Sequence, residues 1–318
     1  MLYRTTIIIV SYNTREMTLE CLRSLFALTP SVNGPDPKTE VIVWDNQSSD
    51  GSADSIEAEF GTRVRLIKSE ENLGFAAANN EAAKLSSAEF LLLLNPDTVI
   101  LDDGLDRLVD FAIERPKNGI YGGRTLFGDR TLNSTSCWSK MSVWSLICHA
   151  VGLTAAFPRS NLFDREAIGS WQRDSIREVD IVTGCLFCIR RELWAELGGF
   201  RLKYFMYGEE ADLCLRSKRI GCSPVITPDC TIVHYVGASS SKSERKVCMV
   251  AKAKATLIRD HWPKMLQPIG ILLLWFWAAS RRLGSSLFAM TKKTNKTECK
   301  DKWKLVWKNR KDWLSGYE

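Results

Sequence analysis

The amino-acid sequence predicts an α/β protein with a mixed, mostly parallel sheet. Through the first hundred residues, short apolar runs rich in β-branched residues alternate with helix-like stretches. Strands that are buried on both faces of a parallel sheet are continuously apolar, as these runs are. A length of 318 residues, 45% of them hydrophobic, is enough to bury a large core. In such a fold, functional residues lie at the carboxyl ends of the strands.

The expected elements follow one another in the order that βαβ units require. We expect strands and intervening helices at residues 6–10, 16–28, 40–44, 52–60, 64–68, 75–85 and 90–94, then a surface helix at 102–115 and a short strand at 119–123. Residues 125–177 show no sustained period, which indicates a long insertion with a helix near 143–153. After it we expect a strand at 179–189, a helix at 191–197 closed by Gly198 and Gly199, and a strand at 231–235.

The C-terminal part of the chain differs from the rest in charge. Residues 242–318 hold 18 Lys and Arg against 6 Asp and Glu, whereas the first 241 residues hold 25 basic and 31 acidic ones. We therefore predict a catalytic domain at 1–245 and a basic helical segment at 246–318, which begins with a helix at 246–261. Such a segment is typical of contact with a polyanion, either an anionic membrane surface or nucleic acid.

Residues 269–279 favour the membrane as the partner. They carry no charge, but eleven residues are too few to cross a bilayer, which needs about 20. Trp275 and Trp277 among Leu and Ile, with Arg281 and Arg282 directly after, are typical of a helix in the membrane interface. The alternative is an ordinary helix that packs on the main domain. We favour an anionic membrane surface and do not expect nucleic acid as a partner.

Cysteine usage and the amino terminus indicate a cytoplasmic protein. The ten cysteines have no disulfide-like rhythm, and no secretory signal precedes the first expected strand. Cys185 and Cys188 lie in an apolar run without a second pair, so a buried strand explains them better than a zinc site. The sequence has neither G-x-G-x-x-G after the first strand nor a Walker motif, which argues against a Rossmann dehydrogenase or a P-loop nucleotidase.

Three residues at expected strand ends carry candidate chemistry. Asp97 follows the most apolar strand, and one carboxylate with open coordination positions is typical of a Mg²⁺ or Mn²⁺ site that a phosphate completes. His234 also ends a strand, although a lone histidine is more often a structural hydrogen-bonding group. Asp45 is placed to accept a hydrogen bond from a ring N–H such as N3 of a pyrimidine, while Asp50 and Gly51 are typical of a turn and helix cap.

A cluster of carboxylates occurs at residues 209–212. Glu209, Glu210 and Asp212 lie within four positions, beside aromatic residues. Like charges this close disfavour one another's ionisation, so the cluster is a candidate acid/base site. Acids are also favoured at the start of a helix, and Arg216 follows Asp212 by four residues. The spacing alone leaves both interpretations open.

Eight short motifs occur in order between about residues 5 and 240. They are IIIVSYN (7–13), VWDNQSSDGS (43–52), NLGFAAANN (72–80), LNPD (94–97), TGC (183–185), GGF (198–200), EEADL (209–213) and HYVGAS (234–239). Each is modest alone, but the ordered set resembles family 2 of the inverting glycosyltransferases with a GT-A fold, a Rossmann-like α/β fold, and especially its rhamnosyltransferase-like branch.

The resemblance implies donor-binding roles. Tyr12, Asn13 and Asp45 fall in the segments where the family holds the nucleotide. Asn72 and Asn79 fall where donor contacts are made.

The resemblance also implies a metal site. Asp97 matches the last acid of the family's metal-binding D-x-D motif, whose first acid is replaced here by Asn95. His234 is implied as a ligand of the metal or the diphosphate, so the expected cofactor is Mg²⁺ or Mn²⁺.

Catalytic and acceptor-binding residues follow from the same resemblance. Glu210 occupies the position of the family's catalytic base, normally an Asp, with Glu209 as the second candidate. Asp212 and Arg216 are expected to brace the helix. Gly184 is a candidate for the acceptor side. Trp138 and Trp171 are candidates for stacking on acceptor sugars, although buried packing is their default.

The implied function is a metal-dependent glycosyl transfer with inversion. Glu210 would take a proton from an acceptor hydroxyl, which attacks the anomeric carbon in one in-line displacement. The implied donor is a dTDP- or UDP-sugar, with dTDP-rhamnose as the best match. The expected acceptor is a lipid-linked saccharide or polysaccharide precursor at the cytoplasmic face of the membrane. The departures at Asn95 and Glu210 leave a second hypothesis, a catalytically inactive GT-A-fold binding or scaffold protein on the membrane.

Overall fold

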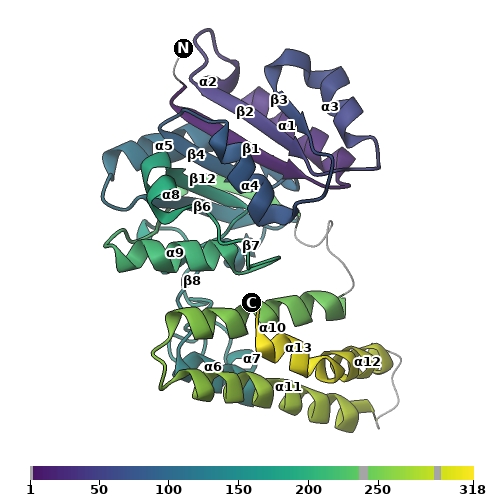
Figure 1. Ribbon diagram of the computed structural model, residues 1–318. Helices are drawn as coiled ribbons and strands as arrows, with labels where there is room; N and C mark the ends of the chain where they lie inside the picture. Colours follow the sequence, from purple (N-terminus) through teal and green to yellow (C-terminus); the bar gives the residue numbers. More distant parts are fainter. Residues whose placement is uncertain (1–2, 236–242, 290–294) are drawn as a thin grey trace. The chain divides into compact units, whose positions relative to one another are not determined.

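Alternating strands and helices form over the first hundred residues, as the apolar periodicity predicts. The computed structural model describes residues 3–235, 243–289 and 295–318 (Figure 1). Each strand and helix expected up to residue 115 is present, with ends within two residues of the predicted ones. The runs that form the first, second and fourth strands are largely buried, and all five residues of the fourth strand are buried, whereas the third strand, at the edge of the sheet, has no buried residue.

The strands are β1 (Thr5–Ser11), β2 (Thr39–Asp45), β3 (Arg65–Lys68), β4 (Phe90–Leu94), β5 (Thr98–Ile100), β6 (Ile120–Leu126), β7 (Leu132–Asn133), β8 (Cys137–Trp138), β9 (Arg177–Glu178), β10 (Ile181–Val182), β11 (Leu186–Arg190) and β12 (Val225–His234). The first α-helices are α1 (Arg15–Leu28), α2 (Pro30–Asn33), α3 (Ser52–Phe60), α4 (Gly74–Lys84), α5 (Gly104–Glu114), α6 (Val143–Val151) and α7 (Leu153–Ala156). The remaining ones are α8 (Arg191–Leu197), α9 (Glu209–Arg219), α10 (Ser243–His261), α11 (Gln267–Ala289), α12 (Asn295–Lys308) and α13 (Arg310–Ser315). Two short 3-10 helices are η1 (Gly61–Arg63) and η2 (Ser134–Ser136).

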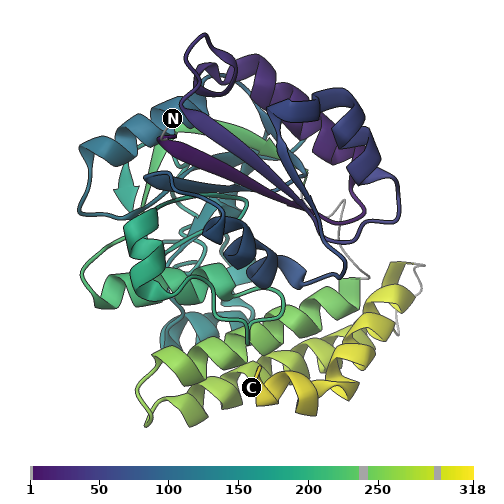
Figure 2. The same cartoon turned by 45° about the horizontal axis from the view of Figure 1, so that its top comes forward.

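One mixed sheet organises the N-terminal part of the chain. Its strand order is β3-β2-β1-β4-β11-β6-β12-β5, with β7 beside β6 and β9 beside β12. The first four strands in this order are parallel neighbours, whereas β11 runs antiparallel to both β4 and β6. The register aligns the carboxyl ends, because Ser11 lies opposite Asp45, which lies opposite Lys68. Figure 2 shows the strands side by side with helices on both faces of the sheet.

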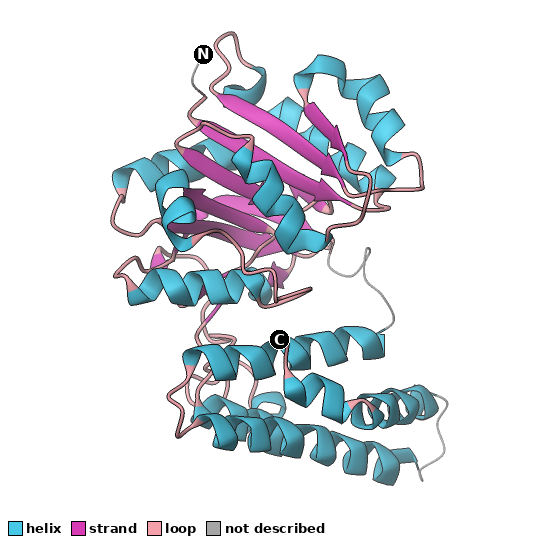
Figure 3. Ribbon diagram, in the orientation of Figure 1, coloured by secondary structure: helices cyan, strands magenta, loops and turns pink. Residues whose placement is uncertain are grey.

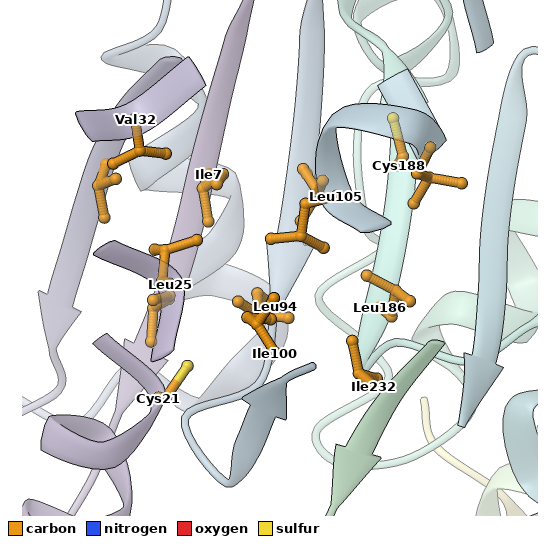
Figure 4. Close-up of a cluster of buried hydrophobic side chains, with 14 of the residues drawn as sticks. Ile7, Cys21, Leu25, Val32, Leu94, Ile100, Leu105, Leu186, Cys188 and Ile232 are labelled. Atoms are coloured by element: carbon orange, nitrogen blue, oxygen red, sulfur yellow. The ribbon is translucent and has the colours of Figure 1, made fainter. Parts of the chain in front are cut away.

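The main core lies between one face of the sheet and the helices α1 and α5. Alternate residues of each strand point to opposite faces, so Ile7 enters this core while Ile8 is buried on the other face, where α4 contacts β1 and β2. Figure 4 shows Leu25 of α1 and Leu105 of α5 in the same layer as Leu94 of β4. The strand ends that carry polar residues are thereby held by a fully packed sheet.

A second compact unit is formed by the segments Ser139–Trp171, Lys203–Gly208 and Ser240–Glu318. It consists of α6, α7 and α10 to α13, which appear as helices in Figure 3. Its own core surrounds Trp313, which is fully buried, and includes Leu146 of α6 together with apolar residues of α10 and α11. The unit therefore contains part of the insertion as well as the whole basic segment predicted at 246–318.

Three strands differ from their predicted bounds, of which β6 simply runs three residues beyond the expected end at 123. The strand expected at 179–189 is wrong as a single element, because β10 pairs with β8 in a separate two-stranded sheet and β11 joins the main sheet. Both strands are buried, so residues 179–189 are largely apolar and the sequence gives no sign that the chain changes from one sheet to the other. The strand expected at 231–235 begins earlier, at Val225, because a shift of register between Ile226 and Thr231 carries β12 past the interruption at Pro228 and Asp229.

Other expectations in this half of the chain are confirmed. The helix expected near 143–153 is α6, and the helix expected at 246–261 is part of α10. Helix α8 ends at Gly198, whose φ of +70° places it in the left-handed region that favours glycine. Of the HYVGAS motif, only His234 and Tyr235 are described, and 236–239 lie outside the described residues.

Candidate active site

Polar loops follow the aligned carboxyl ends of β1, β2 and β3. Asn46 donates its backbone N–H to the carbonyl of Ser11, and Ser69 donates its backbone N–H to the carbonyl of Asp45. The backbone hydrogen bonds between neighbouring strands thus continue for one residue beyond the strand ends and hold the three loops together. This edge is where open parallel sheets bind their ligands.

Asp45 ends β2 with one carboxylate oxygen available. The side chain is 3% exposed, and its Oδ1 accepts a hydrogen bond from the backbone N–H of Ser48 at 2.9 Å. Its Oδ2 is buried without a hydrogen-bond partner among the described residues. A buried acceptor left unpaired costs free energy, so a ligand that donates an N–H here would remove that cost.

Asn13 has a structural contact at this edge. Its backbone φ is +51°, its side-chain oxygen accepts from the backbone N–H of Ser49 at 2.8 Å, and its own N–H donates to the Ser48 hydroxyl. These bonds join the loop after β1 to the loop after β2. The neighbouring Tyr12 is 48% exposed and leaves its ring available to a ligand. A direct contact of Asn13 with the donor stays a prediction.

Asn46 is a residue that the sequence left without a role. It is 2% exposed, its amide nitrogen donates to Oδ1 of Asn72 at 2.8 Å, and its own Oδ1 accepts from the N–H of Leu73 at 2.9 Å. Asn72 also accepts from the N–H of Gly74, at the start of α4. The signal that was available is its position directly after Asp45 in the polar cluster at the strand end.

Asn79 lies within α4 and is turned inward. Its side chain is 1% exposed and donates to the carbonyl of Phe75 at 2.9 Å. This bond is the helical back-bonding that polar side chains often make. The donor contact expected of Asn79 stays a prediction, and in this structure the residue secures the first turns of α4.

Asp97 and His234 are brought together by strand pairing. Strand β5 runs antiparallel to β12 with Thr98 opposite His234, and Tyr235 donates its backbone N–H to the carbonyl of Asp97. The Nε2 atom of His234 lies 3.2 Å from Oδ1 of Asp97, and Asp97 is only 4% exposed. Two residues 137 positions apart in sequence therefore form one polar pair at the end of the sheet.

The imidazole of His234 is held in its charged form. Burial alone would lower its pKa, but the neighbouring Cys185 and the hydrogen bond and charge of Asp97 outweigh burial and raise the pKa to about 10. Asn95 lies nearby in the chain, where its backbone N–H donates to the carbonyl of Cys185 and its own carbonyl accepts from the Thr98 hydroxyl. The backbone of Asn95 thus fixes the turn that presents Asp97.

Glu209 and Glu210 begin α9 in different environments. Glu209 is 5% exposed and its Oε2 has no hydrogen-bond partner among the described residues. Burial, and next the charge of Glu210, hold the pKa of Glu209 well above its usual range, which favours the protonated acid. Glu210 is only partly buried. A Cβ built on Gly184 would lie 3.8 Å from the Cβ of Glu210 and 3.6 Å from the ring of Phe75, so Gly184 keeps the backbone close to Glu210.

Asp212 and Arg216 brace α9, as the sequence predicted. Asp212 is fully buried, and its Oδ2 accepts from Nε of Arg216 at 2.7 Å. The remaining guanidinium nitrogens donate to the carbonyls of Leu197 and Gly199, at the end of α8. The pair fixes the helix that carries the two glutamates.

The two tryptophans proposed for the acceptor lie in different units. Trp138 is half-buried in β8, opposite Ile181 in the two-stranded sheet. Trp171 is 9% exposed and belongs to the second compact unit. Buried packing therefore accounts for Trp171, whereas the ring of Trp138 is partly accessible.

Sequence comparison assigns a family to this arrangement. Residues 6–162 match the profile described as Glycosyl transferase family 2, a range that includes the strand-end loops after β1, β2 and β4. The chain belongs to glycosyl transferase family 2. The glycosyltransferase is also similar to the O-antigen biosynthesis protein RfbC of Myxococcus xanthus, at 30% identity over 206 residues. That match covers 64% of this chain and 15% of the Myxococcus protein, so the chain spans a small part of that relative.

A mycobacterial enzyme and a solved structure extend the comparison. The glycosyltransferase is 27% identical over 219 residues to the N-acetylglucosaminyl-diphospho-decaprenol L-rhamnosyltransferase of Mycobacterium tuberculosis. This match covers 64% of this chain and 68% of that protein. Its fold is similar to the mannosyltransferase PcManGT from Pyrobaculum calidifontis, solved in complex with GDP-Man and Mn²⁺, with a TM-score of 0.58 at 20% identity. The structural match covers 99% of this chain and 84% of that one and supports the GT-A fold.

Among the helices of the described residues, none combines the length and apolarity that crossing a bilayer requires.

Proposed function

We propose that this glycosyltransferase moves a sugar, rhamnose, from dTDP-rhamnose to a hydroxyl of a lipid-linked saccharide or polysaccharide precursor, with inversion at the anomeric carbon. The observation that carries the proposal is the Asp97–His234 pair, 3.2 Å apart, at the sheet edge that also presents Asp45. The activity for which the mycobacterial relative is named supports the choice of rhamnose and of a lipid diphosphate acceptor.

The unpaired oxygen of Asp45 supports recognition of a pyrimidine base. A buried carboxylate oxygen can accept from the N3–H that uracil and thymine both present. Tyr12, at the end of the neighbouring strand, offers an exposed ring to the same nucleotide. A dTDP- or UDP-sugar fits these contacts, and a purine without an N–H at this point does not.

Asp97 and His234 fit a divalent cation, either Mg²⁺ or Mn²⁺. A carboxylate and a neutral imidazole are both suitable ligands, and Oδ1 of Asp97 and Nε2 of His234, 3.2 Å apart, could face the same ion. Binding would release the proton that His234 otherwise holds beside Asp97. When bound, the ion would neutralise charge on the leaving nucleoside diphosphate. Asn95 would contribute only weakly, because a neutral amide replaces the carboxylate.

Glu210 serves as the general base of the proposed reaction. Its carboxylate takes the proton of the acceptor hydroxyl while the oxygen bonds to the anomeric carbon and the bond to the diphosphate breaks. Glu209, buried and held in its acid form, is less suited to accept a proton. The acceptor approaches beside Gly184, where the absence of a side chain leaves Glu210 accessible, and Trp138 offers a partly exposed ring.

A panel of sugar nucleotides tests the proposal. Nucleoside diphosphate release is measured with and without Mn²⁺ or Mg²⁺ for the wild type, Asp97→Ala and Glu210→Gln. We expect slow, metal-dependent hydrolysis of dTDP-rhamnose by the wild type and its loss in both variants. Hydrolysis of another sugar nucleotide in place of dTDP-rhamnose would identify a different donor sugar. Full activity of Glu210→Gln would show that Glu210 is not the general base.

The membrane is the proposed place of action, with the protein peripheral on its cytoplasmic face. A lipid-linked acceptor is confined to the bilayer, and the basic excess of residues 242–318 would attract the protein to anionic lipids. Transfer to a short soluble acceptor would then need no vesicles, whereas transfer to the lipid-linked acceptor would.

A further inference from the structure

Helix α11 is apolar on two opposite faces. One face packs into the core of the second unit through Leu274, which is 2% exposed, and Ala278, which is fully buried. The opposite face carries the apolar side chains Ile269, Leu272, Phe276 and Leu283. At about 100° per residue these four positions fall within a sector of roughly 60°, centred opposite Leu274 and Ala278. We call them the outer face of α11.

The outer face is open to solvent. Ile269, Leu272, Phe276 and Leu283 are 44%, 62%, 45% and 66% exposed, and Met265 in the turn before the helix is 88% exposed. A helix that is apolar all round is normally buried, and a continuous exposed apolar surface marks a contact with a partner or a membrane. The described residues leave this face uncovered, so the face is available to a partner or a membrane.

The charges around α11 favour an anionic partner. A groove of about 650 Å³ shares Leu272 with the outer face and is lined by Ile271, Trp275 and Leu314 together with Arg259 and Lys264. No carboxylate lines the described part of this groove. Residues 242–318 carry 18 basic and 6 acidic residues, so a second copy of the chain would meet like charge here.

We propose that the outer face of α11 docks on the surface of an anionic lipid bilayer, with the helix lying in the plane of the interface. Apolar side chains then enter the boundary between headgroups and acyl chains, and Arg259 and Lys264 face lipid phosphates. An interfacial helix with tryptophan and flanking cations fits this location, whereas the absence of a span in the described helices argues against crossing. The biological role of this docking, contact with the membrane that holds the acceptor, rests on the proposed function.

Vesicle flotation tests the docking without any sugar transfer. The full chain is mixed with vesicles of phosphatidylcholine alone or with phosphatidylglycerol added, and the floated fraction is measured for two matched variants. The first carries Leu272→Glu and Phe276→Glu, at positions 62% and 45% exposed. The control carries Leu202→Glu and Ile220→Glu in the first unit, at positions 63% and 47% exposed. Both variants add the same charge at equally exposed apolar sites.

We expect the wild type and the control to float with the anionic vesicles, and the α11 variant to lose at least about tenfold in partitioning. Retained donor hydrolysis in the α11 variant would show that it is folded. Equal flotation of both variants, or no flotation of the wild type, would overturn the docking. A wild-type dimer that the α11 variant loses, without vesicle binding, would assign the face to a second copy.

Failure of the proposed function has a different signature. A protein that floats as expected but transfers no sugar from any donor would overturn the glycosyl transfer and leave the docking intact. A protein that transfers sugar to a soluble acceptor but never floats would overturn the docking and leave the glycosyl transfer intact.

Discussion

Two adjacent glutamates at the start of α9 differ in what surrounds them. Glu209 is buried with an unpaired oxygen, and burial and the charge of Glu210 raise its pKa well above the usual range. Glu210 is only partly buried and lies beside Gly184. A base must accept a proton and reach the acceptor, so the buried, acid-form environment of Glu209 favours Glu210, the residue that the family resemblance places first.

Isosteric substitution should reveal that difference. Because the amide of Gln resembles a neutral carboxylic acid, Glu209→Gln should retain kcat within about threefold. Glu210→Gln removes the base and should lower kcat by about a hundredfold or more, with donor binding largely kept. Initial rates of transfer and calorimetric binding of the nucleoside diphosphate measure both effects. A larger loss in Glu209→Gln than in Glu210→Gln would exchange the two roles.

Asp45 should determine affinity for the base. Asp45→Asn places an amide where an acceptor oxygen is needed, so the Kd of dTDP and of UDP should rise about ten- to a hundredfold. Asp54→Asn is the control, because Asp54 is 88% exposed and pairs with Lys68 on the surface. Titration calorimetry with both nucleotides gives the comparison. Unchanged Kd values for Asp45→Asn would place the base elsewhere.

At the level of elements, α9 depends on the buried pair that anchors it. Arg216→Met would leave Asp212 without its closer cation and two carbonyls of the α8 end without their donors. We expect a loss of about 3 kcal/mol in the free energy of unfolding. Arg23→Met breaks the exposed Arg23–Glu59 pair and should change the free energy of unfolding much less, because solvent screens this pair. Urea unfolding measures both, and equal losses would contradict a structural role for the buried pair.

How far the sequence determines an element depends on the range of its contacts. Strands such as β4 and helices such as α4 follow from local periodicity, and the strand-end positions of Asp45 and Asp97 follow with them. The 3.2 Å contact between Asp97 and His234 arises from pairing of β5 with β12, which no local pattern reveals. The break between β10 and β11 was missed because both pieces are buried. The link from Asn46 to Asn72 likewise joins two loops across the sheet edge.

At the level of the whole molecule, stability should fall in mild acid because of the second unit. Burial, and next the charge of Lys254, lower the pKa of His149 from 6.5 to about 4. Its ring stacks on Trp277 with centroids 5.6 Å apart. Since the unfolded chain binds the proton first, this contribution is complete above pH 6.5 and is lost as pH falls toward 4. His234, whose pKa is raised to about 10, has the opposite effect: its stabilisation is complete below pH 6.5 and is lost as pH rises toward 10, so it does not cause a loss of stability in acid.

His149→Phe isolates this effect while keeping an aromatic ring against Trp277. Urea unfolding is measured at intervals between pH 7.5 and 4.5. As the pH falls, the free energy of unfolding should fall more steeply for the wild type than for the variant, and the difference in slope should correspond to at most one additional proton bound on unfolding. Parallel pH profiles for the two proteins would contradict the assignment. The wild-type profile also includes the carboxylates, which protonate mainly below pH 5.

The interleaving of the two compact units bears on how the chain folds as it leaves the ribosome. Residues 139–171 belong with residues 240–318, and β12, whose neighbours are β6 and β5, ends only at His234. Domains commonly fold as they are translated, but here an early segment must wait for a late one. Until translation passes β12, β5 lacks its partner strand, β6 lacks one of its neighbours, and α6 lacks the helices that cover Leu146. A nascent chain stalled between residues 171 and 240 would therefore present unpaired edges and apolar surface to chaperones.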